Sequence, residues 1–514
     1  MCIGIILWIE YINTYFIYVY EYLILYLPHY QAKISGKYWL GNRTPQLQKN
    51  NQKRHQKGAS ILKTCKILMP IGGLGAGINA EAFAIGMEMK PDVIAIDAGS
   101  TDSGPAYLAN GMGKVSRGMV KSDLAISVKG AMNAGIPLFV GSCGTCGTDA
   151  MVDYCAELVT EIFKENGFSG KIAKVYSQQK PETLERKWDE GKIHALEGAP
   201  EITRQTFSEC NNIVAVIGAE PFIEAYKNGA NIVLTGRATD TAIIAALPVY
   251  LGCNVAAAWH GAKTVECGAQ CADKADGMGV FLTVDEKGFA VRPLLPDAHC
   301  TPFTTAAHLL YENADPMRLI EPSGTIVADE AVYTQLDEYT TYVTGTKFEH
   351  AVQYTNKLEG ASITGYQNIS LVGVANREVL ADPERWVKNF SAYADKQLKK
   401  AGFTPDEYSY NFKLYGYNAV IEGPVPEGTP PPREIGVLLT VTAKTQETAT
   451  QVAKVFNPLL LHFPPHFDMD LPSYAFPFSP VDCPRGATYE FKLYHVVDVD
   501  DPLELVRIEY QDIK

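Results

Sequence analysis

A polar loop with two carboxylates and two hydroxyls directly follows the apolar run Val93–Ile96. Its residues with reactive side chains lie within six consecutive positions: Asp97, Ser100, Thr101 and Asp102. Two neighbouring carboxyls can act as general acid and base when one is protonated and the other ionised. Asp and Ser in turns also bond their own backbone. We therefore consider both a catalytic pair and simple loop capping.

Two more apolar runs end in loops of the same character. Ile136–Val140 leads into a Gly/Ser/Cys/Thr loop containing Ser142, and Asn231–Thr235 leads into Gly-Arg-Ala-Thr-Asp. Arg237 can fork onto a carboxylate or phosphate, and Ser142, Thr239 and Asp240 complete the predicted substrate- or anion-binding set. The alternatives are an Arg237–Asp240 ion pair and an N-cap formed around Thr239 and Asp240.

A glycine-rich segment, Gly72–Gly77, follows the short apolar run Lys66–Ile71. Glycines allow backbone N–H groups to approach an anion closely, so Gly73 and Gly75 are predicted to form one wall of an anion pocket. The spacing differs from the dinucleotide fingerprint G-x-G-x-x-G. No nicotinamide or other cofactor is predicted, although an acyl-CoA is a possible substrate.

A second group of reactive side chains lies in the segment Trp259–Gly268. His260 is a candidate general base with Glu266 as its partner, and the alternative is a structural histidine beside an aromatic ring. Further along the chain, Lys357 and Glu359 are expected to form an exposed pair, and the alternative is that they enter the polar crevice.

No metal site is predicted. Cys143 and Cys146 form a CxxC, but no second CxxC or histidine pair completes a four-ligand zinc set. His462 and His466 are four residues apart, yet the prolines between them prevent a helix from aligning the two rings. Small residues in a closely packed loop explain the CxxC better.

The order of elements places these loops. Strand-like runs, including the one at 212–217, alternate with helix-like segments from about residue 66 to 250, which indicates a parallel sheet with right-handed crossovers. The fold class is therefore α/β, with an N-terminal parallel Rossmann-like sheet followed by a smaller α+β region with antiparallel strands. Within the second region a helix with charged outer faces is predicted over 383–402. Ligands of such sheets bind beyond the carboxyl ends of the strands. The predicted divisions are an extension at 1–65, an α/β domain at 66–330, an α+β region at 331–470 and a C-terminal tail at 471–514.

Charge is distributed unevenly. The chain carries −13 overall, yet residues 1–66 hold nine basic and two acidic side chains, a balance of +7 that leaves −20 for the remainder. An acidic body argues against a nucleic-acid partner. The eleven cysteines lack a small-domain disulfide spacing, which favours a reducing, cytoplasmic location. The apolar segment 3–28 is expected to lie outside the fold, and the alternative is a membrane anchor with a basic cytoplasmic flank.

Several separate segments resemble the acyclic terpene utilisation (AtuA) family. They are DVIAIDAGSTDSGPAYL, LTGRATDTA, AWHGAKTVECGA, LYENADPMRLIEPSGT and YTNKLEGASITGYQ, and the resemblance spans about residues 66 to 465. The family occurs with genes for citronellol and geraniol breakdown, so the resemblance implies a cytosolic catabolic protein that meets branched acyl-CoA intermediates. It supplies no catalytic residues.

The residues and the resemblance together lead to one expectation and one alternative. The expectation is an enzyme that acts on a small carboxylate or branched acyl-CoA by hydration, lyase or isomerase chemistry, with Asp97, Asp102, His260 and Glu266 moving protons. The alternative is a non-catalytic ligand-binding subunit of a catabolic complex. A homo-oligomer is expected as a general tendency of such proteins, and a partner subunit is possible.

Overall fold

The computed structural model describes residues 63–99, 103–275, 279–311, 313–421, 423–426, 428–468 and 470–514. The chain divides into two units, Met1–Ile61 and Leu62–Lys514, and the account below concerns the second. The extension and its possible membrane anchor at 3–28 lie outside the described residues.

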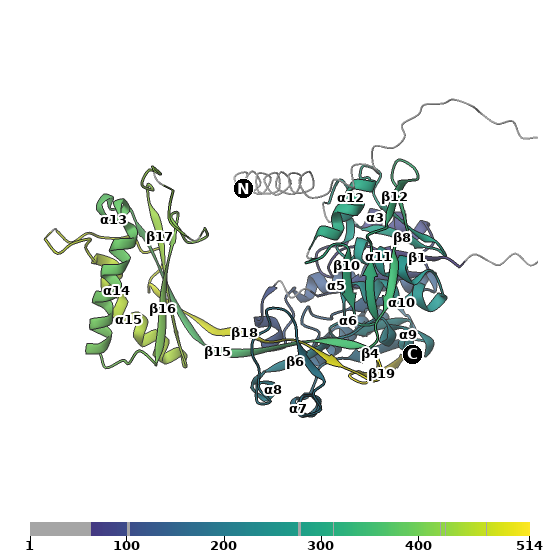
Figure 1. Ribbon diagram of the computed structural model, residues 1–514, viewed down its shortest axis with the longest axis horizontal. Helices are drawn as coiled ribbons and strands as arrows, with labels where there is room; N and C mark the ends of the chain where they lie inside the picture. Colours follow the sequence, from purple (N-terminus) through teal and green to yellow (C-terminus); the bar gives the residue numbers. More distant parts are fainter. Residues whose placement is uncertain are drawn as a thin grey trace, which may run out of the picture. The chain divides into compact units, whose positions relative to one another are not determined.

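Five parallel strands form the centre of a large sheet (Figure 1). Their order is β1-β2-β3-β7-β4, and neighbouring strands pair in parallel. The strands are β1 (Cys65–Met69), β2 (Val93–Asp97), β3 (Leu138–Gly141), β7 (Ile232–Thr235) and β4 (Gly170–Tyr176). The connecting helices include α3 (Ala80–Glu88), α5 (Arg117–Ala134), α6 (Asp149–Asn166) and α9 (Glu220–Lys227).

Successive side chains of a strand point to opposite faces of the sheet. Helices cover both faces, so these strands are buried on both sides. Ala95 and Phe139 face a core completed by α9, α10 (Asp240–Leu251) and α11 (Val255–Val265). Ile94 and Val140 face the other core, beneath α3, α5 and α6. The apolar runs of the sequence have no polar alternation for this reason.

Antiparallel strands extend the sheet at both edges, so the sheet is mixed. One edge carries β8 (Val280–Val284), β9 (Gly288–Pro293), β13 (Thr341–Thr344) and β12 (Val332–Gln335), and the other carries β19 (Arg507–Ile513). The coarse α/β prediction with parallel pairs is confirmed, whereas a Rossmann-like arrangement is not. The predicted divisions at residues 330 and 470 fall within this sheet, because it contains strands from before residue 330, from between the two positions and from after residue 470.

A second sheet is built on one long strand, β15 (Thr355–Val374). It has the order β16-β17-β15-β18-β5, and β6 also pairs with β15. The strands are β16 (Tyr408–Tyr415), β17 (Ile435–Ala443), β18 (Asp482–Asp498), β5 (Ile193–Ala195) and β6 (Asn212–Val216). The prediction that the run at 212–217 belongs to the parallel sheet is wrong, because β6 runs antiparallel to residues 357–361 of β15.

Two helices, α14 (Pro383–Lys400) and α15 (Gln446–His462), pack beside β16 and β17 (Figure 1). Every second residue of β17 is buried, as expected of a sheet covered on one face. Trp386, Phe390 and Phe456 fill the core between these layers. The antiparallel α+β character predicted for this part of the chain is present.

The remaining elements are short. A three-stranded sheet has the order β10-β11-β14. The bounds are α4 (Ala106–Asn110), α7 (Pro181–Asp189), α8 (Thr206–Glu209), η2 (Gly268–Cys271), α12 (Pro302–Ala307), η3 (His308–Leu310), β10 (Arg318–Glu321), β11 (Gly324–Val327), β14 (Lys347–His350) and α13 (Arg377–Ala381).

The glycine-rich loop after β1 wraps around a carboxylate of the chain itself. Backbone N–H groups of Gly75, Gly77 and Ile78 donate to the two carboxylate oxygens of Asp123 on α5, with N–O distances of 2.8, 3.1 and 2.8 Å. Asp123 is buried. The amide groups that the sequence offered to a ligand anion therefore hold the loop against α5 instead.

Replacing this internal anion should weaken the fold. Asp123→Ala leaves three N–H groups without their acceptor. Those of Gly75 and Ile78 are buried, whereas Gly77 is exposed, and each buried unsatisfied donor costs about 1–3 kcal/mol. We expect a loss of at least about 2 kcal/mol, measured as a lower urea midpoint. Asp297→Ala, which removes an exposed ion pair with Lys274, should cost no more than about 1 kcal/mol. Equal losses in the two variants would contradict the assigned role of Asp123.

Candidate functional site

Three loops meet at the carboxyl ends of β2, β3 and β7. The strand register sets Asp97 opposite Gly141, and the N–H of Ser142 donates to the carbonyl of Gly236 at 3.0 Å. Gly99 fits here only because it lacks a side chain: a Cβ would lie 2.3 Å from the Cβ of Ser142. The predicted convergence of the three loops is present, and Ser100, Thr101 and Asp102 lie outside the described residues.

Arg237 links these loops to the second sheet. Its side chain is 8% exposed, its Nε lies 3.2 Å from Oε2 of Glu359, and one terminal nitrogen donates to Oγ of Ser142 at 2.9 Å. The same nitrogen lies 3.6 Å from a carboxylate oxygen of Asp240. The alternative ion pair is thus present, and the guanidinium is already held by groups of the chain.

Glu359 on β15 is buried, so the prediction of an exposed Lys357–Glu359 pair is wrong for the carboxylate. Lys357 does approach its second oxygen, at 3.2 Å. Burial by itself would raise the pKa of Glu359, but the positive charges of Arg237 and Lys357 outweigh it and hold that pKa below its ordinary value. Glu359 therefore stays ionised as the counter-charge of Arg237.

Asp97 is a buried carboxyl at the end of β2. It is 4% exposed; Oδ2 accepts from the N–H of Gly99 at 3.1 Å, and Oδ1 has no hydrogen-bond partner within the part of the chain described. Burial, followed by the negative charge of Asp240, raises its pKa well above the ordinary value, although Arg237 opposes the shift. Such a carboxyl favours its protonated form.

Two more buried carboxyls, Glu266 and Glu321, lie near Asp97 and Asp240. We call these four residues the carboxylate cluster. Burial raises the pKa of Glu266 to about 8, despite its ion pair with Lys263, and raises that of Glu321 to about 7. The hydroxyl of Thr241 donates to Oε1 of Glu321 at 2.6 Å, while Oε2 has no hydrogen-bond partner among the described residues. Carboxyls that titrate near neutrality suit general acid–base chemistry.

Asp240 lies at the centre of this cluster. Its charge shifts the pKa of Asp97, Glu266 and Glu321 upward, and it raises the pKa of Arg237 and Lys263 as well. Its side chain is 35% exposed, more than the other three. Thr239 is the N-cap of α10, as its spacing allowed, and its hydroxyl accepts from the N–H of Ala242. Asp240 is thus the solvent-facing member of the cluster.

His260 is not placed for the role suggested by its sequence neighbours. It is fully buried on α11, its Nδ1 lies 2.6 Å from the hydroxyl of Thr346, and its Nε2 lies 3.2 Å from the hydroxyl of Tyr333. Burial lowers its pKa to about 3. Both ring nitrogens are engaged away from Glu266, which corresponds to the structural alternative.

The glycine loop contributes less than predicted. The N–H of Gly75 is taken by Asp123, whereas a Cβ placed on Gly73 would meet nothing within 4 Å. Gly72 packs against the segment that carries Glu266, since a Cβ there would be 2.6 Å from the backbone of Cys267. The loop therefore supports the segment that carries Glu266.

The thiols and histidines noted in the sequence have other surroundings. Cys143 and Cys146 are free and buried, and burial raises the pKa of Cys146. His462 lies 2.8 Å from the carbonyl of Pro472, and His466 pairs with Glu378 at 3.0 Å. In the described part of the chain, one carboxylate oxygen of Glu266, the sulfur of Cys267 and one ring nitrogen of His308 lie within 4.8 Å of one another.

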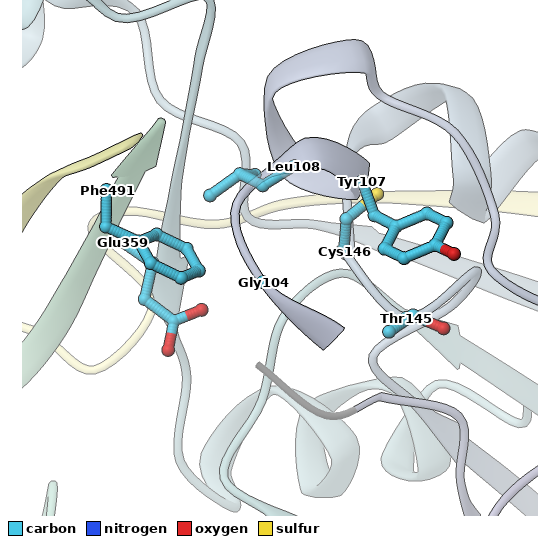
Figure 2. Close-up of a pocket in the computed structure, with 7 residues that line it drawn as sticks. All are labelled: Gly104, Tyr107, Leu108, Thr145, Cys146, Glu359 and Phe491. Atoms are coloured by element: carbon cyan, nitrogen blue, oxygen red, sulfur yellow. The ribbon is translucent and has the colours of Figure 1, made fainter. Parts of the chain in front are cut away.

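A shallow pocket opens beside Glu359 (Figure 2). Glu359 and Phe491 come from β15 and β18, while the other side is formed by α4 and the loop after β3. The lining is mixed, with apolar, hydroxyl and carboxylate groups: Gly104, Tyr107, Leu108, Thr145, Cys146, Glu359 and Phe491. Glu359 thus lines the pocket and also contacts Arg237, which lies among the three strand-end loops.

The comparisons with known proteins place the chain in a family. The family model described as acyclic terpene utilisation family protein AtuA matches residues 140–480, about two thirds of the chain. The chain belongs to the AtuA family. Among curated proteins and among solved structures, nothing matches. The range that defines this AtuA-family chain includes Arg237, Glu266, Glu321 and Glu359, while Asp97 precedes it.

Sequence reasoning missed Glu321, Lys263 and His308, and it misjudged Glu359. A signal existed for some of them, because Glu321 and Glu359 lie in segments that resemble the AtuA family. Nothing in the local spacing showed that these segments meet at the ends of β2 and β7. Separately, no helix in the described ranges has the length and apolar character needed to cross a membrane.

Removing the central guanidinium should be costly. Arg237→Ala takes one of two cations from buried Glu359, and breaking a buried pair from one side typically costs about 3–5 kcal/mol. Arg318→Ala removes an exposed pair with Glu349 and should cost less than about 1 kcal/mol. Urea denaturation measures both losses. A similar small loss in both variants would contradict the central position of Arg237.

Glu321 should make stability fall as pH rises. Its folded-state pKa of about 7 exceeds the ordinary 4.5, so between these pH values the folded chain retains a proton that the unfolded chain releases. At about 1.4 kcal/mol per pH unit this amounts to roughly 3 kcal/mol. Glu321→Gln cannot ionise, and relative to wild type it should gain up to that amount between pH 4.5 and pH 7.

Denaturation at several pH values in EDTA, which keeps cations out of the carboxylate cluster, tests this expectation. Glu349→Gln, a change of an exposed carboxylate whose pKa is lowered by Arg318, should show no such gain. A constant difference between Glu321→Gln and wild type across the range would show that Glu321 has an ordinary pKa.

Proposed function

We propose that this AtuA-family chain acts in acyclic terpene catabolism as an enzyme that moves protons on a carboxylate or branched acyl-CoA substrate. Family membership supports the metabolic role. The reaction class is supported by the carboxylate cluster at the carboxyl ends of β2 and β7, where ligands of α/β sheets bind.

One observation carries the proposal. Asp97 is buried at a strand end, keeps one carboxyl oxygen without a hydrogen-bond partner among the described residues, and favours its protonated form. An unsatisfied buried carboxyl is unfavourable for stability. Groups retained in such a state cluster at functional sites. A protonated carboxyl with an open oxygen can deliver its proton to a bound substrate.

Different members of the cluster would carry out the two halves of a proton-transfer reaction. Asp97 or Glu321 would give a proton to the carbon next to a thioester carbonyl, and Asp240, the more exposed carboxylate, would take one from water or from another carbon. Addition of water, its elimination and a double-bond shift all follow this pattern without any oxidation. The arrangement is one of paired carboxyls in unlike environments.

The pocket beside Glu359 has room for about one water-sized group, so it would receive a small group of the substrate and not the whole branched chain. Leu108 and Phe491 offer apolar surface, and Thr145 offers a hydroxyl. Arg237 then acts as a positioning residue that fixes Ser142 and Glu359. Ser100, Thr101, Thr239 and Gly73 remain proposed anion contacts, and Asp102 remains a proposed acid or base. A cytoplasmic location and self-association also remain proposals.

Exchange of substrate hydrogen with solvent tests the reaction class without knowledge of the product. The full-length protein is incubated in D₂O with saturated and α,β-unsaturated branched acyl-CoAs and with the free acids, and deuterium is followed by mass spectrometry. We expect exchange or hydration with at least one thioester, reduced at least about 100-fold in Asp97→Asn. Asp395→Asn, which alters a carboxylate on α14 bonded to Tyr410, should retain the wild-type rate.

Binding by calorimetry separates the enzyme from the alternative, a non-catalytic ligand-binding subunit. Tight binding with no exchange, equal in wild type and Asp97→Asn, would support the subunit. Absence of both binding and exchange with every acid and thioester would remove this substrate class.

A further inference from the structure

We propose that Glu266, Cys267 and His308 bind a Zn²⁺ ion beside the carboxylate cluster. One carboxylate oxygen, the sulfur and one imidazole nitrogen lie within 4.8 Å of one another. Zinc distances of about 2.0–2.3 Å imply ligand-to-ligand separations of roughly 3.3–3.8 Å in a tetrahedral site. The three atoms thus need to approach one another by at most about 1.0–1.5 Å.

The backbone supports this arrangement. Glu266 and Cys267 follow α11 directly, and His308 begins η3. Gly72 presses against the carbonyl of Cys267, since a Cβ there would lie 2.6 Å from both its carbon and oxygen. This close approach, made possible by a glycine, fixes the segment that carries two of the three ligands.

One buried polar atom of the group points to a missing partner. His308 is 4% exposed, and its Nε2 has no hydrogen-bond partner among the described residues. Burying such atoms without a partner is costly. A cation at this position, with a bound water in its open fourth place, would satisfy groups of this kind.

The charges around the site favour a divalent cation. Asp97, Asp240, Glu266, Glu321 and Glu359 provide five carboxyl groups, whereas Arg237, Lys263 and Lys357 provide three cations. Acidic side chains thus outnumber basic ones around the site, which favours a cation. Lys263 already pairs with Glu266, so its ammonium competes with the metal for that carboxylate.

The donor set selects the metal. A thiolate, an imidazole and a carboxylate suit Zn²⁺, while Mg²⁺ and Ca²⁺ prefer oxygen ligands only. The inference does not rest on the proposed substrate, because metal binding and substrate exchange are separate measurements and either can fail alone.

Metal titration of the full-length protein tests the proposal. After EDTA treatment and dialysis, wild type should bind one Zn²⁺ per chain, and Mg²⁺ should not compete. Co²⁺ should bind in its place and give a sulfur-to-cobalt absorption band. Cys267→Ser should lose that band, and His308→Gln should bind Zn²⁺ at least about tenfold more weakly. Cys210→Ser, a change of another partly buried free cysteine, should retain both properties.

Lys263→Met guards against variants that merely fail to fold. Removing the competing ammonium should tighten Zn²⁺ binding, an effect that loss of structure cannot produce. No stoichiometric Zn²⁺ in wild type, an unchanged cobalt band in Cys267→Ser, or binding no tighter in Lys263→Met would each overturn the proposal.

Discussion

The arrangement of the site depends on the buried contact between Arg237 and Glu359. Two charges taken out of water are tolerated only when they meet with good geometry and their remaining atoms are bonded. Here Ser142 and Asp240 take further positions around the guanidinium, and Lys357 approaches the second oxygen of Glu359. The contact joins the end of β7, the loop after β3 and the long strand β15. Two sheets therefore share one polar centre.

The site forms at strand ends because apolar burial stops there. Ile94 and Ala95 of β2 each face a hydrophobic core, and the first polar residue, Asp97, is the last residue of the strand. Glycines then permit an approach closer than side chains allow: a Cβ on Gly147 would lie 2.2 Å from the backbone nitrogen of Arg237. Close packing of loops, with little water between them, is what shifts the pKa of the carboxyls.

Much of the local structure could be read from the sequence. The apolar run at 93–96 became β2, the run at 231–235 became β7, and the helix predicted over 383–402 became α14 (Pro383–Lys400). These predictions were correct because a strand buried on both faces and an amphipathic helix each have a distinct pattern of apolar residues in the sequence. The strand at 212–216 misled the analysis, since its pattern says nothing about which sheet it joins. Its pairing with β15 is decided by residues about 145 positions away.

The same limitation explains the site residues. The sequence could place Asp97, Ser142 and Arg237 near one another because each lies at or just after the end of a strand of one parallel sheet, a rule that converts sequence into position. Glu321 and Glu359 follow no such rule, because they come from β10 and from inside β15. His260 was chosen for its residue type, yet its neighbours Thr346 and Tyr333 lie more than seventy positions away.

A functional unit cannot therefore be cut at residue 330. Residues 66–330 would contain the three strand-end loops, Lys263, Glu266 and Glu321, but they would lack Glu359 and one side of the pocket. Arg237 would then keep the half-exposed Asp240 and lose its buried partner. Because an unpaired buried charge is strongly unfavourable, the loops that converge on Arg237 would lose the contact that orders them. The polar centre belongs to the two sheets jointly, although the sequence pattern changes between them.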